Sequence, residues 1–532
     1  MPELTSPPTP GHLSHDRTAG VRQWCALAVL MLPVLIIAID NTVLSFALPS
    51  IAETLEPSGA QQLWIIDAYP LVLAGLLVAM GSLGDRIGRR RLLLIGATGF
   101  AAVSVVAAYS QTPEMLIAAR AGLGFFGATL MPATLSLLRN LFTDRSERRL
   151  AIAIWSASIG AGAAMGPVVG GFLLEHFWWG SVFLFAIPLL VPLLILAPVL
   201  VPESKDPDPA RIDGISIALS LLAMTPIVYA IKDLASGGSL FGTALPALIG
   251  ALAVWMFVRR QLRRPDPMLD VRMFTVPAFA GAVLVNLLAI FALVGFLYFV
   301  SQHLQLVVGL SPMQAGLRLL PGILAMITAG LLAVVLARML RPAMIISGGM
   351  MLAAFGYATI AVFAEPTSVW SFVAAFAALG AGIGVAETIS NDMILSTAPP
   401  EKAGAAAAIS ETAYELGAVT GTSVLGAILL AQYRANVVTP ENAGFDTSAA
   451  RETLGGAQAV ADRLPAEQAS GLLDSAADAF TSGVTITSGI AACLMVVAGG
   501  ASWLIMRKIP AGQRDGSGDH ADIEVHETNR AT

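Results

Sequence analysis

The sequence predicts an all-α protein that crosses a membrane fourteen times, with both termini on the cytoplasmic side. Its composition is 56% hydrophobic and only 12% charged, which leaves too little polar surface for a water-soluble protein of 532 residues. Fourteen apolar stretches are each long enough to cross a hydrocarbon core of roughly 30 Å. Of the 30 Lys and Arg residues, 24 fall on the two terminal tails and on alternate connections between these stretches, and the positive-inside rule places those segments in the cytoplasm.

The apolar stretches divide into six, then two, then six. The first six cover residues 24–48, 63–83, 92–109, 115–138, 151–174 and 182–201. The middle two cover residues 212–231 and 241–258, and the last six cover residues 278–299, 313–336, 343–363, 369–393, 405–432 and 484–506. Apart from Asp213 at its very start, the middle pair carries no acid or base inside its apolar stretches, so we interpret it as a hairpin inserted between two working halves. Tryptophans near the span ends are expected to anchor at the membrane interface: Trp24, Trp64, Trp179, Trp370 and Trp503.

This pattern predicts the domain organisation. We expect an N-terminal six-helix bundle at 21–201, an inserted two-helix hairpin at 202–264 and a C-terminal six-helix bundle at 265–507, between tails at 1–20 and 508–532 that are polar and expected to be disordered. The C-terminal bundle includes an external loop, 433–482, in which an Ala-rich stretch could form a short helical hairpin. The loop could cover the external mouth or contact substrate directly, and we favour cover. Only four basic residues fall on the external connections: Lys232 and, in this loop, Arg434, Arg451 and Arg463.

Several classes of function are disfavoured by the sequence. The net charge of −6 gives no sign of nucleic-acid binding. Cys25 and Cys493 both fall in apolar spans, so no disulfide and no metal site are expected. No phosphate-binding loop and no catalytic cluster of His or Cys occurs, so we expect neither an enzyme nor a bound cofactor. Arg outnumbers Lys by 26 to 4, which suggests a high-GC bacterial genome. We expect the protein to lie in the bacterial inner membrane.

The string GSLGDRIGRRR, residues 81–91, lies where the second span reaches the cytoplasm. Its glycines allow helix ends to approach closely, and Asp85 could pair with an Arg and with a helix N-terminus from the other half. A cluster of arginines that only fixes topology would explain Arg89 to Arg91, but not the ordered glycines and the acid. The residues singled out are therefore Gly81, Asp85, Arg86, Gly88 and Arg89.

Two further spans carry unusual residues. Arg120 lies within the otherwise apolar fourth span, where a charge costs about 2.5 to 3.5 kcal/mol on insertion scales, so we expect it to be paired. The fifth span contains GAGAAMGPVVGG, in which small residues permit tight helix contact and the proline bends the helix. Helix packing alone would explain much of this string. Its candidate conformational residues are Gly166, Pro167, Gly170 and Gly171.

Acidic residues inside the spans are the candidate substrate- and proton-binding groups, because an intramembrane carboxylate is costly. They are Asp40, Asp67, Glu387, Glu411 and Glu415.

The rise per residue places two of these acids, Asp40 and Asp67, together with Arg120, roughly 8 to 12 Å from the external ends of their helices. We expect Arg120 to pair with Asp40, which leaves Asp67 as the freer site for a cation or proton. The Asp40 pair could instead be purely structural. Glu411 and Glu415 are four residues apart and share one helix face, where two like charges are hard to keep ionised together.

These motifs resemble those of the major facilitator superfamily. In that family the 81–91 loop latches the two halves in the outward-open state, the string IAARAGLGFFG around Arg120 is similar to the second motif, and Gly166 to Gly171 match the motif of drug antiporters. Leu123 and Phe126 depart from the usual Gln and Gly of the second motif. Further strings resemble the 14-helix drug:proton antiporters, most of all the QacA-type multidrug exporters: IDNTVLSFALP, WIIDAYPLVLAG, VPES, DPMLDVRMF, LSPMQAGLRLLP and ETAYELGAVTG.

The resemblance implies a major facilitator fold of two six-helix bundles plus two inserted helices. It also implies a proton-coupled antiporter that exports lipophilic cations such as quaternary ammonium compounds, dyes and antiseptics, works as a monomer in membrane lipid and needs only the proton gradient. Met326 stands where some QacA-type relatives carry an acid, which argues against a strong preference for long dications. The alternative function is a dedicated exporter of an endogenous metabolite or self-made antibiotic.

Overall fold

The computed structural model describes residues 19–142, 144–206, 213–235, 238–265, 267–363, 368–398, 403–440 and 446–507. Within these ranges every regular element is helical, which confirms the predicted all-α class. The two tails that were expected to be disordered lie outside the described residues, apart from residues 19 and 20.

The elements follow the predicted order of six spans, two spans and six spans. The first half contains α1 (Val21–Leu55), α2 (Gly59–Ile87), α3 (Arg89–Ala108), α4 (Pro113–Leu141), α5 (Arg145–His176), α6 (Ser181–Leu184) and α7 (Ala186–Leu200). The middle pair is α8 (Gly214–Ala235) and α9 (Leu240–Arg263). The second half contains η1 (Val271–Thr275), α10 (Pro277–Gln302), η2 (His303–Val307), α11 (Pro312–Leu336), α12 (Pro342–Phe363), α13 (Val369–Thr397), α14 (Ala403–Asn436), α15 (Ser448–Glu452), α16 (Leu454–Ala461) and α17 (Ala466–Met506).

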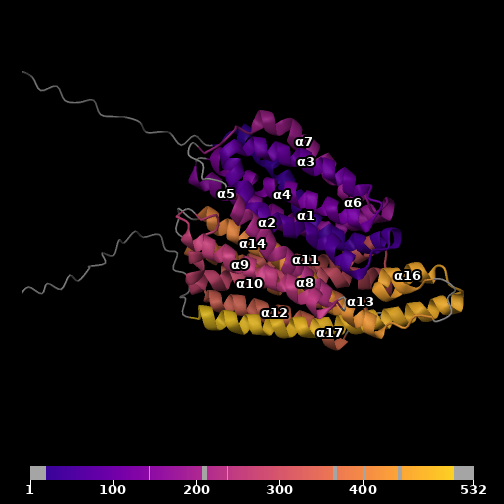
Figure 1. Cartoon of the computed structure of the whole chain (residues 1–532). Helices are drawn as coiled ribbons and strands as arrows, with labels where there is room; N and C mark the ends of the chain where they lie inside the picture. The colour runs from indigo at the N-terminus through magenta and orange to yellow at the C-terminus, as the bar shows by residue number, and fades with distance from the viewer. Residues whose placement is uncertain are drawn as a thin grey trace, which may run out of the picture.

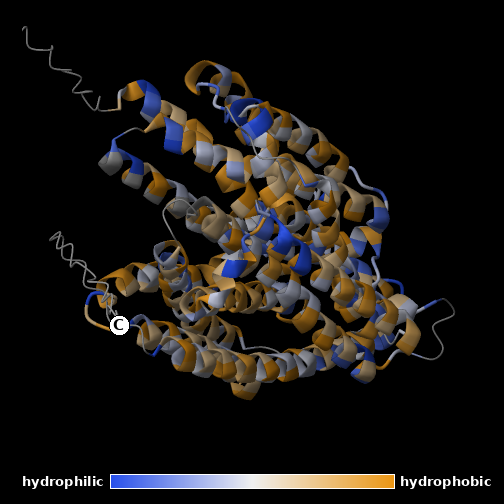
Figure 2. Ribbon diagram, turned by 60° about the vertical axis from the view of Figure 1, so that its left-hand side comes forward, coloured by the Kyte–Doolittle hydropathy of each residue, from blue (hydrophilic) through white to orange (hydrophobic). Residues whose placement is uncertain are grey.

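The number of spans agrees with the prediction. Among the described residues 13 helices are long and apolar enough to cross a membrane, and the bent helix α5 brings the total to 14. The two parts of α5, Leu150–Ala163 and Met165–His176, meet at 42°. Pro167 cannot donate a backbone hydrogen bond to Ala163, so the bend lies where the proline breaks the helical ladder. Figure 2 shows that hydrophobic residues dominate the long helices.

Helix ends are set by local sequence. Ser58 and Gln61 form a capping box at the start of α2, and Ser311 and Gln314 do the same at the start of α11. Prolines stand in the first turn of α4, α10 and α11, where their missing N–H groups have no helical partner in any case. Inside a bilayer the backbone must satisfy its own hydrogen bonds, so these apolar runs form uninterrupted helices between such ends.

The two halves pack side by side, with the hairpin α8–α9 lying across them (Figure 1). Helix α2 of the first half packs against α14 of the second, α5 packs against α11, and α1 contacts α10. Helix α8 contacts both α2 and α14, so the hairpin spans the seam between the halves. Both ends of the described chain lie at one end of the bundle, and α16 lies at the other (Figure 1).

The external loop of the second half folds onto the first half. Helix α16 and the first turns of α17 form a helical hairpin, as the sequence suggested, and α16 packs on α1. Glu452 pairs with Arg434 and accepts a hydrogen bond from the backbone N–H of Gly59 at the start of α2 (3.3 Å). Arg463 forms an exposed ion pair with Glu56 at the end of α1 (3.3 Å). The loop therefore covers the external end of the first half.

Contacts between the halves are concentrated toward the external end. The Ser301 hydroxyl of α10 donates to the Ser45 carbonyl of α1 (2.7 Å), and the Ser311 hydroxyl of α11 donates to the Glu175 carboxylate of α5 (3.0 Å). The structure is therefore closed toward the outside.

Candidate functional site

Asp40 and Arg120 form the buried ion pair that the sequence predicted. The Arg120 guanidinium of α4 donates to the Asp40 carboxylate of α1 at 2.6 Å. Its Nε atom donates to the Ile65 carbonyl of α2 (3.1 Å), and the guanidinium stacks over the Tyr69 ring at 4.6 Å. Arg120 is 1% exposed and Asp40 is 7% exposed. Because both charges are held inside one half, the pair fastens α1, α2 and α4 together.

The second half presents three acids, and one of them, Glu415, lies close to this pair. Glu415 of α14 is 1% exposed and accepts one long hydrogen bond from the Asn41 side chain of α1, at 3.5 Å. Glu411 lies one turn away on α14, and Glu387 of α13 is close enough to repel it electrostatically. Both of these side chains are half-buried. No ion pair involves any of these three acids among the described residues.

Aromatic side chains lie within the same group of charges. Tyr69 of α2 is close enough to Asp40, Arg120 and Glu415 to interact with their charges, and Tyr414 of α14 interacts in the same way with its neighbouring acids. The Tyr69 hydroxyl forms no hydrogen bond within the described part of the chain. The region between the halves thus combines carboxylates that lack basic partners with aromatic rings, a combination that suits an organic cation.

The expectation for Asp67 was wrong. Its carboxylate is fully buried and forms an ion pair with the Lys232 ammonium of α8 at 2.8 Å. The Ser423 hydroxyl of α14 donates to the same carboxylate oxygen at 2.6 Å. Asp67 is therefore held by three parts of the molecule, the first half, the hairpin and the second half, and it is not the freer site.

Lys232 was also misplaced by the sequence analysis, which assigned it to an external loop and treated the hairpin as free of buried charges. The structure places Lys232 inside the last turn of α8, 2% exposed, with its ammonium 3.9 Å from the centre of the Trp64 ring. Trp64 is therefore part of this buried charge contact and does not act only as an interfacial anchor. One feature of the sequence could have indicated this contact. Lys232 is the one basic residue that the sequence places on the external side outside the long loop.

The 81–91 string adopts a compact turn at the cytoplasmic end of α2. Gly88 has φ 109°, a conformation that a side chain would strain, and this explains a glycine between α2 and α3. Asp85 pairs with Arg89 at 2.7 Å, and its carbonyl accepts a hydrogen bond from the Asp206 backbone (2.9 Å). Both contacts stay on the N-terminal side of the molecule, so the predicted pairing of Asp85 with a helix end of the other half does not occur here. Gly81 and Arg86 lie on the last two turns of α2.

The small residues of α5 serve contacts to both halves. A Cβ atom on Gly171 would lie 2.7 Å from the Met313 backbone of α11, so only glycine permits this approach between the halves. Gly166 and Gly170 face α1 of the same half, and the Pro167 carbonyl faces Gly316 of α11. The string therefore sits at the seam between α5 and α11, where alternating opening must change the contact.

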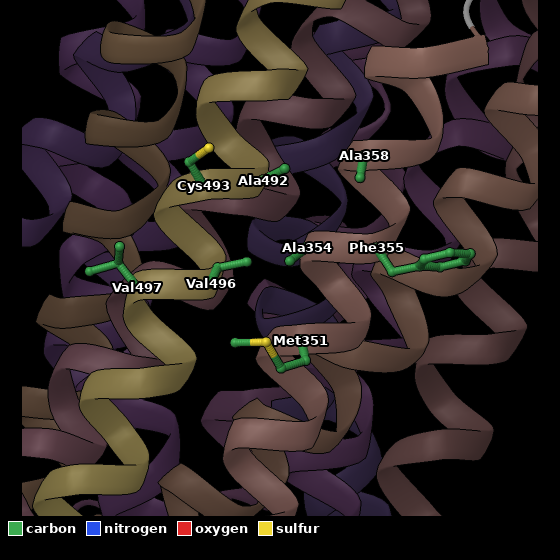
Figure 3. A pocket seen from close by; sticks show the side chains of 8 residues that line it. All are labelled: Met351, Ala354, Phe355, Ala358, Ala492, Cys493, Val496 and Val497. Carbon is green, nitrogen blue, oxygen red and sulfur yellow. The ribbon is translucent and has the colours of Figure 1, made fainter.

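The hollow on the outer side of α12 and α17 is not a candidate for this chemistry. Figure 3 shows the side chains that line it, among them Met351, Phe355, Cys493 and Val497. Every lining residue is apolar or a thiol, and Phe355 and Val497 are largely exposed on the outer surface. The hollow contains no carboxylate for a cation and faces the membrane.

Comparisons with known proteins agree with this architecture. Residues 30–422 match the Major Facilitator Superfamily. The chain is 55% identical to the "Multidrug efflux pump LfrA" of Mycolicibacterium smegmatis over 90% of this chain and 95% of that protein. It is 37% identical to the "Methyl viologen resistance protein SmvA" of Salmonella typhimurium over 92% of this chain and 99% of that protein.

A solved structure supports the fold alone. The crystal structure of a bacterial homologue of the human lysosomal transporter Spinster aligns with a TM-score of 0.63 at 17% identity, over 92% of this chain and 98% of that one. The predicted class of multi-pass membrane protein, with two bundles and two added helices, is confirmed. The chain belongs to the Major Facilitator Superfamily, and it is accordingly a transporter and not an enzyme.

Proposed function

We propose that this transporter is a proton-coupled antiporter that exports lipophilic cationic drugs across the bacterial inner membrane and works as a monomer. The names of its relatives, a multidrug efflux pump and a methyl viologen resistance protein, support drug export. The observation that carries the proposal is the group of Glu387, Glu411 and Glu415, three acids of the second half for which the described structure records no basic partner. The antiseptics, dyes and quaternary ammonium compounds that the sequence resemblance implied all carry the charge that such a group would attract.

The mechanism follows from the cost of burying charge. An ionised carboxylate in a poorly solvated site needs either a proton or a cation beside it. Two neighbouring acids, Glu411 and Glu415, make this requirement stronger because their charges repel each other. Protons that enter from outside therefore compete with the drug for the same groups. Protonation releases the drug outward, and loss of the proton to the cytoplasm restores the site.

The driving force limits the stoichiometry. Moving one charge through the membrane potential provides about 2.3 kcal/mol per 100 mV. At about 150 mV this amounts to roughly 3.5 kcal/mol, which sustains a gradient of a few hundredfold for each net charge. Exchange of one proton for one monovalent cation moves no net charge and uses only the pH gradient. A ratio above one proton per drug therefore gives the stronger pump.

Closure toward the outside fits the drug-loading state of such a cycle. The contacts that join the halves at α1 with α10, and at α5 with α11, lie beyond the acids on the external side. A cation from the cytoplasm could then reach Glu387 and Glu411, which keep part of their surface accessible.

The test is ethidium efflux from proteoliposomes that contain the full chain, with an imposed pH gradient and with or without a protonophore. Gradient-dependent transport that the protonophore abolishes is the expected result. Folded protein that moves no ethidium under any gradient would contradict the proposal and would favour the dedicated exporter of a metabolite or self-made antibiotic.

A further inference from the structure

The hairpin α8–α9 contributes both apolar and charged side chains to the seam between the halves. Val228 of α8 packs with Leu71 of α2 and Val419 of α14 in a small buried cluster, so one helix of the hairpin touches both halves at one level. One turn further toward the outside, α8 delivers the Lys232 ammonium to this seam.

The surroundings of this ammonium are those of a cation-binding site. Lys232 lies between the Asp67 carboxylate, 2.8 Å away, and the face of the Trp64 ring, 3.9 Å from its centre. A carboxylate and an indole face are the groups that recognise an organic ammonium ion. Both charged side chains are buried, at 2% and 0% exposure, so no second cation shares the carboxylate while Lys232 occupies it.

Charge balance then separates the buried groups into two kinds. Arg120 neutralises Asp40, and Lys232 neutralises Asp67. The remaining acids of the site are the group of Glu387, Glu411 and Glu415. Asp67 is close enough to Arg120 for their charges to interact, and Arg120 acts in turn on Glu415. A change in the net charge of the Asp67–Lys232 contact therefore changes the electrostatic potential where the substrate is proposed to bind.

We propose that Lys232 is a charge-selecting residue, an internal cation supplied by the inserted hairpin that determines how many positive charges the transporter accepts in one substrate. This inference rests on the proposed export of cations. With Lys232 in place, Asp67 adds no net negative charge to the site. Without it, the site gains one uncompensated carboxylate, which favours a divalent over a monovalent cation.

The experiment compares two substrates of the same shape that differ by one charge. Methyl viologen has two positive charges, and N-methyl-4-phenylpyridinium is the similar biaryl with one. The ratio of their kcat/KM values is measured in proteoliposomes at one pH for the full chain. The variants are Lys232→Gln, Lys232→Arg, Asp67→Asn and the combination of Lys232→Gln with Asp67→Asn. A ratio is unaffected by the amount of folded protein, and a role confined to stability would leave it unchanged.

The expected ratio of kcat/KM for the dication to that for the monocation rises as the net charge of the site becomes more negative. Lys232→Gln should raise the preference for the dication about tenfold, as for one added charge at about 10 Å in a medium of effective dielectric constant about 20. Asp67→Asn should lower it by a similar factor. The double variant and Lys232→Arg keep the balance, so their ratio should stay near that of the wild type. The double variant also shows whether the protein folds once the buried pair is removed.

Several results would overturn the inference. One is an unchanged ratio in both single variants while both substrates slow equally. Another is a double variant that folds while neither single variant does, because the pair would then serve stability alone. The two single variants act in opposite directions, so either one that folds is decisive. If the wild type transports neither compound, the proposed export function itself fails. If the wild type transports both compounds but the substitutions leave the ratio of their kcat/KM values unchanged, only the inference about Lys232 fails.

Discussion

The buried acids of the two halves differ in how their charges are compensated. In the first half Asp40 has Arg120 and Asp67 has Lys232, each at ion-pair distance and each buried. In the second half no ion pair involves Glu387, Glu411 or Glu415 within the described part of the chain. The first half therefore contains charges that hold the structure together, and the second half contains charges that are available to a ligand.

This difference indicates which acids are suited to transport. Removing one partner of a buried pair leaves an uncompensated charge, so a paired acid is poorly suited to repeated protonation and release. An acid without a basic partner can alternate between a proton and a cation at lower cost. We therefore propose that the working groups lie mainly on α13 and α14, with the first half as their rigid counterpart.

The largest effect is expected at the unpaired acids. Glu415→Gln should lower gradient-driven efflux of a lipophilic cation by about a hundredfold, because a charged contact of about 3 kcal/mol to the substrate is lost. The glutamine keeps the size of the side chain and its contact with Asn41. The measurement is initial efflux from proteoliposomes under a fixed pH gradient.

Asp392→Asn is the matched control for this variant. Asp392 lies on α13, which packs against the α14 helix of Glu415, but it is exposed toward the cytoplasmic end of α13. Its substitution should leave efflux within about twofold of the wild type, as expected for an exposed charge. Equal losses in both variants would contradict the distinction between unpaired buried acids and other acids.

The paired acids should show the opposite behaviour, a loss of stability. Arg120→Leu leaves Asp40 as a buried unpaired charge and should lower the free energy of unfolding by about 3–5 kcal/mol. The combination of Arg120→Leu with Asp40→Leu removes both charges and should recover most of that loss. Equilibrium unfolding in mixed detergent micelles measures both. A single variant as stable as the wild type would remove Arg120 from its structural role.

The sequence was sufficient to predict the fold because the fold depends on local patterns. Apolar length gave the fourteen spans, and the distribution of Arg and Lys gave their orientation. The pairing of Asp40 with Arg120 was predicted for a related reason. A lone charge in a span needs a partner, and the rise per residue placed these two at the same depth.

The Asp67 contact could not be predicted in this way. Whether Lys232 lies in a loop or in the last turn of a helix depends on a difference of one turn, and the positive-inside rule assigns it by loop. Its contact with Asp67 depends on how the hairpin packs across α2 and α14, and single-sequence patterns do not describe that packing.

A smaller effect is expected at the external cover, where charges join the two halves directly. Glu452 contacts both Arg434 and the start of α2, so Glu452→Gln should loosen closure toward the outside. The contact is partly exposed, so the outward-open population should rise only about two- to fivefold.

Alkylation measures this population. A cysteine placed by Ser301→Cys, between the closed halves, is reacted with an impermeant maleimide from outside after Cys25 and Cys493 are replaced by serine. Glu467→Gln, an exposed acid at the start of α17, is the control and should not change the rate. A rate that rises equally in both variants would exclude a specific role of Glu452 in closure.

The smallest effect concerns a charged contact within the hairpin, where Asp213 at the start of α8 pairs with Arg260 of α9 at the cytoplasmic end. Hydrogen bonds from Arg260 hold the pKa of the Asp213 carboxyl well below its usual range, with further hydrogen bonds from Ser216 and Arg264. A depressed folded-state pKa contributes stability above the unfolded value of about 4 and loses it as the pH falls through the folded value. Asp213→Asn should therefore lower the melting temperature by about 2 °C at pH 7.

The pH dependence of that loss shows whether the Asp213 contact acts through its charge. The difference between Asp213→Asn and the wild type should be the same at pH 7 and pH 5 and should shrink below about pH 4, where the wild-type carboxyl begins to take up a proton in the unfolded chain. Asp474→Asn, an exposed acid of α17, should show no difference at either pH. A loss for Asp213→Asn that persists unchanged at pH 3 would mean that the carboxyl acts there through its shape and hydrogen bonds, and not through its charge.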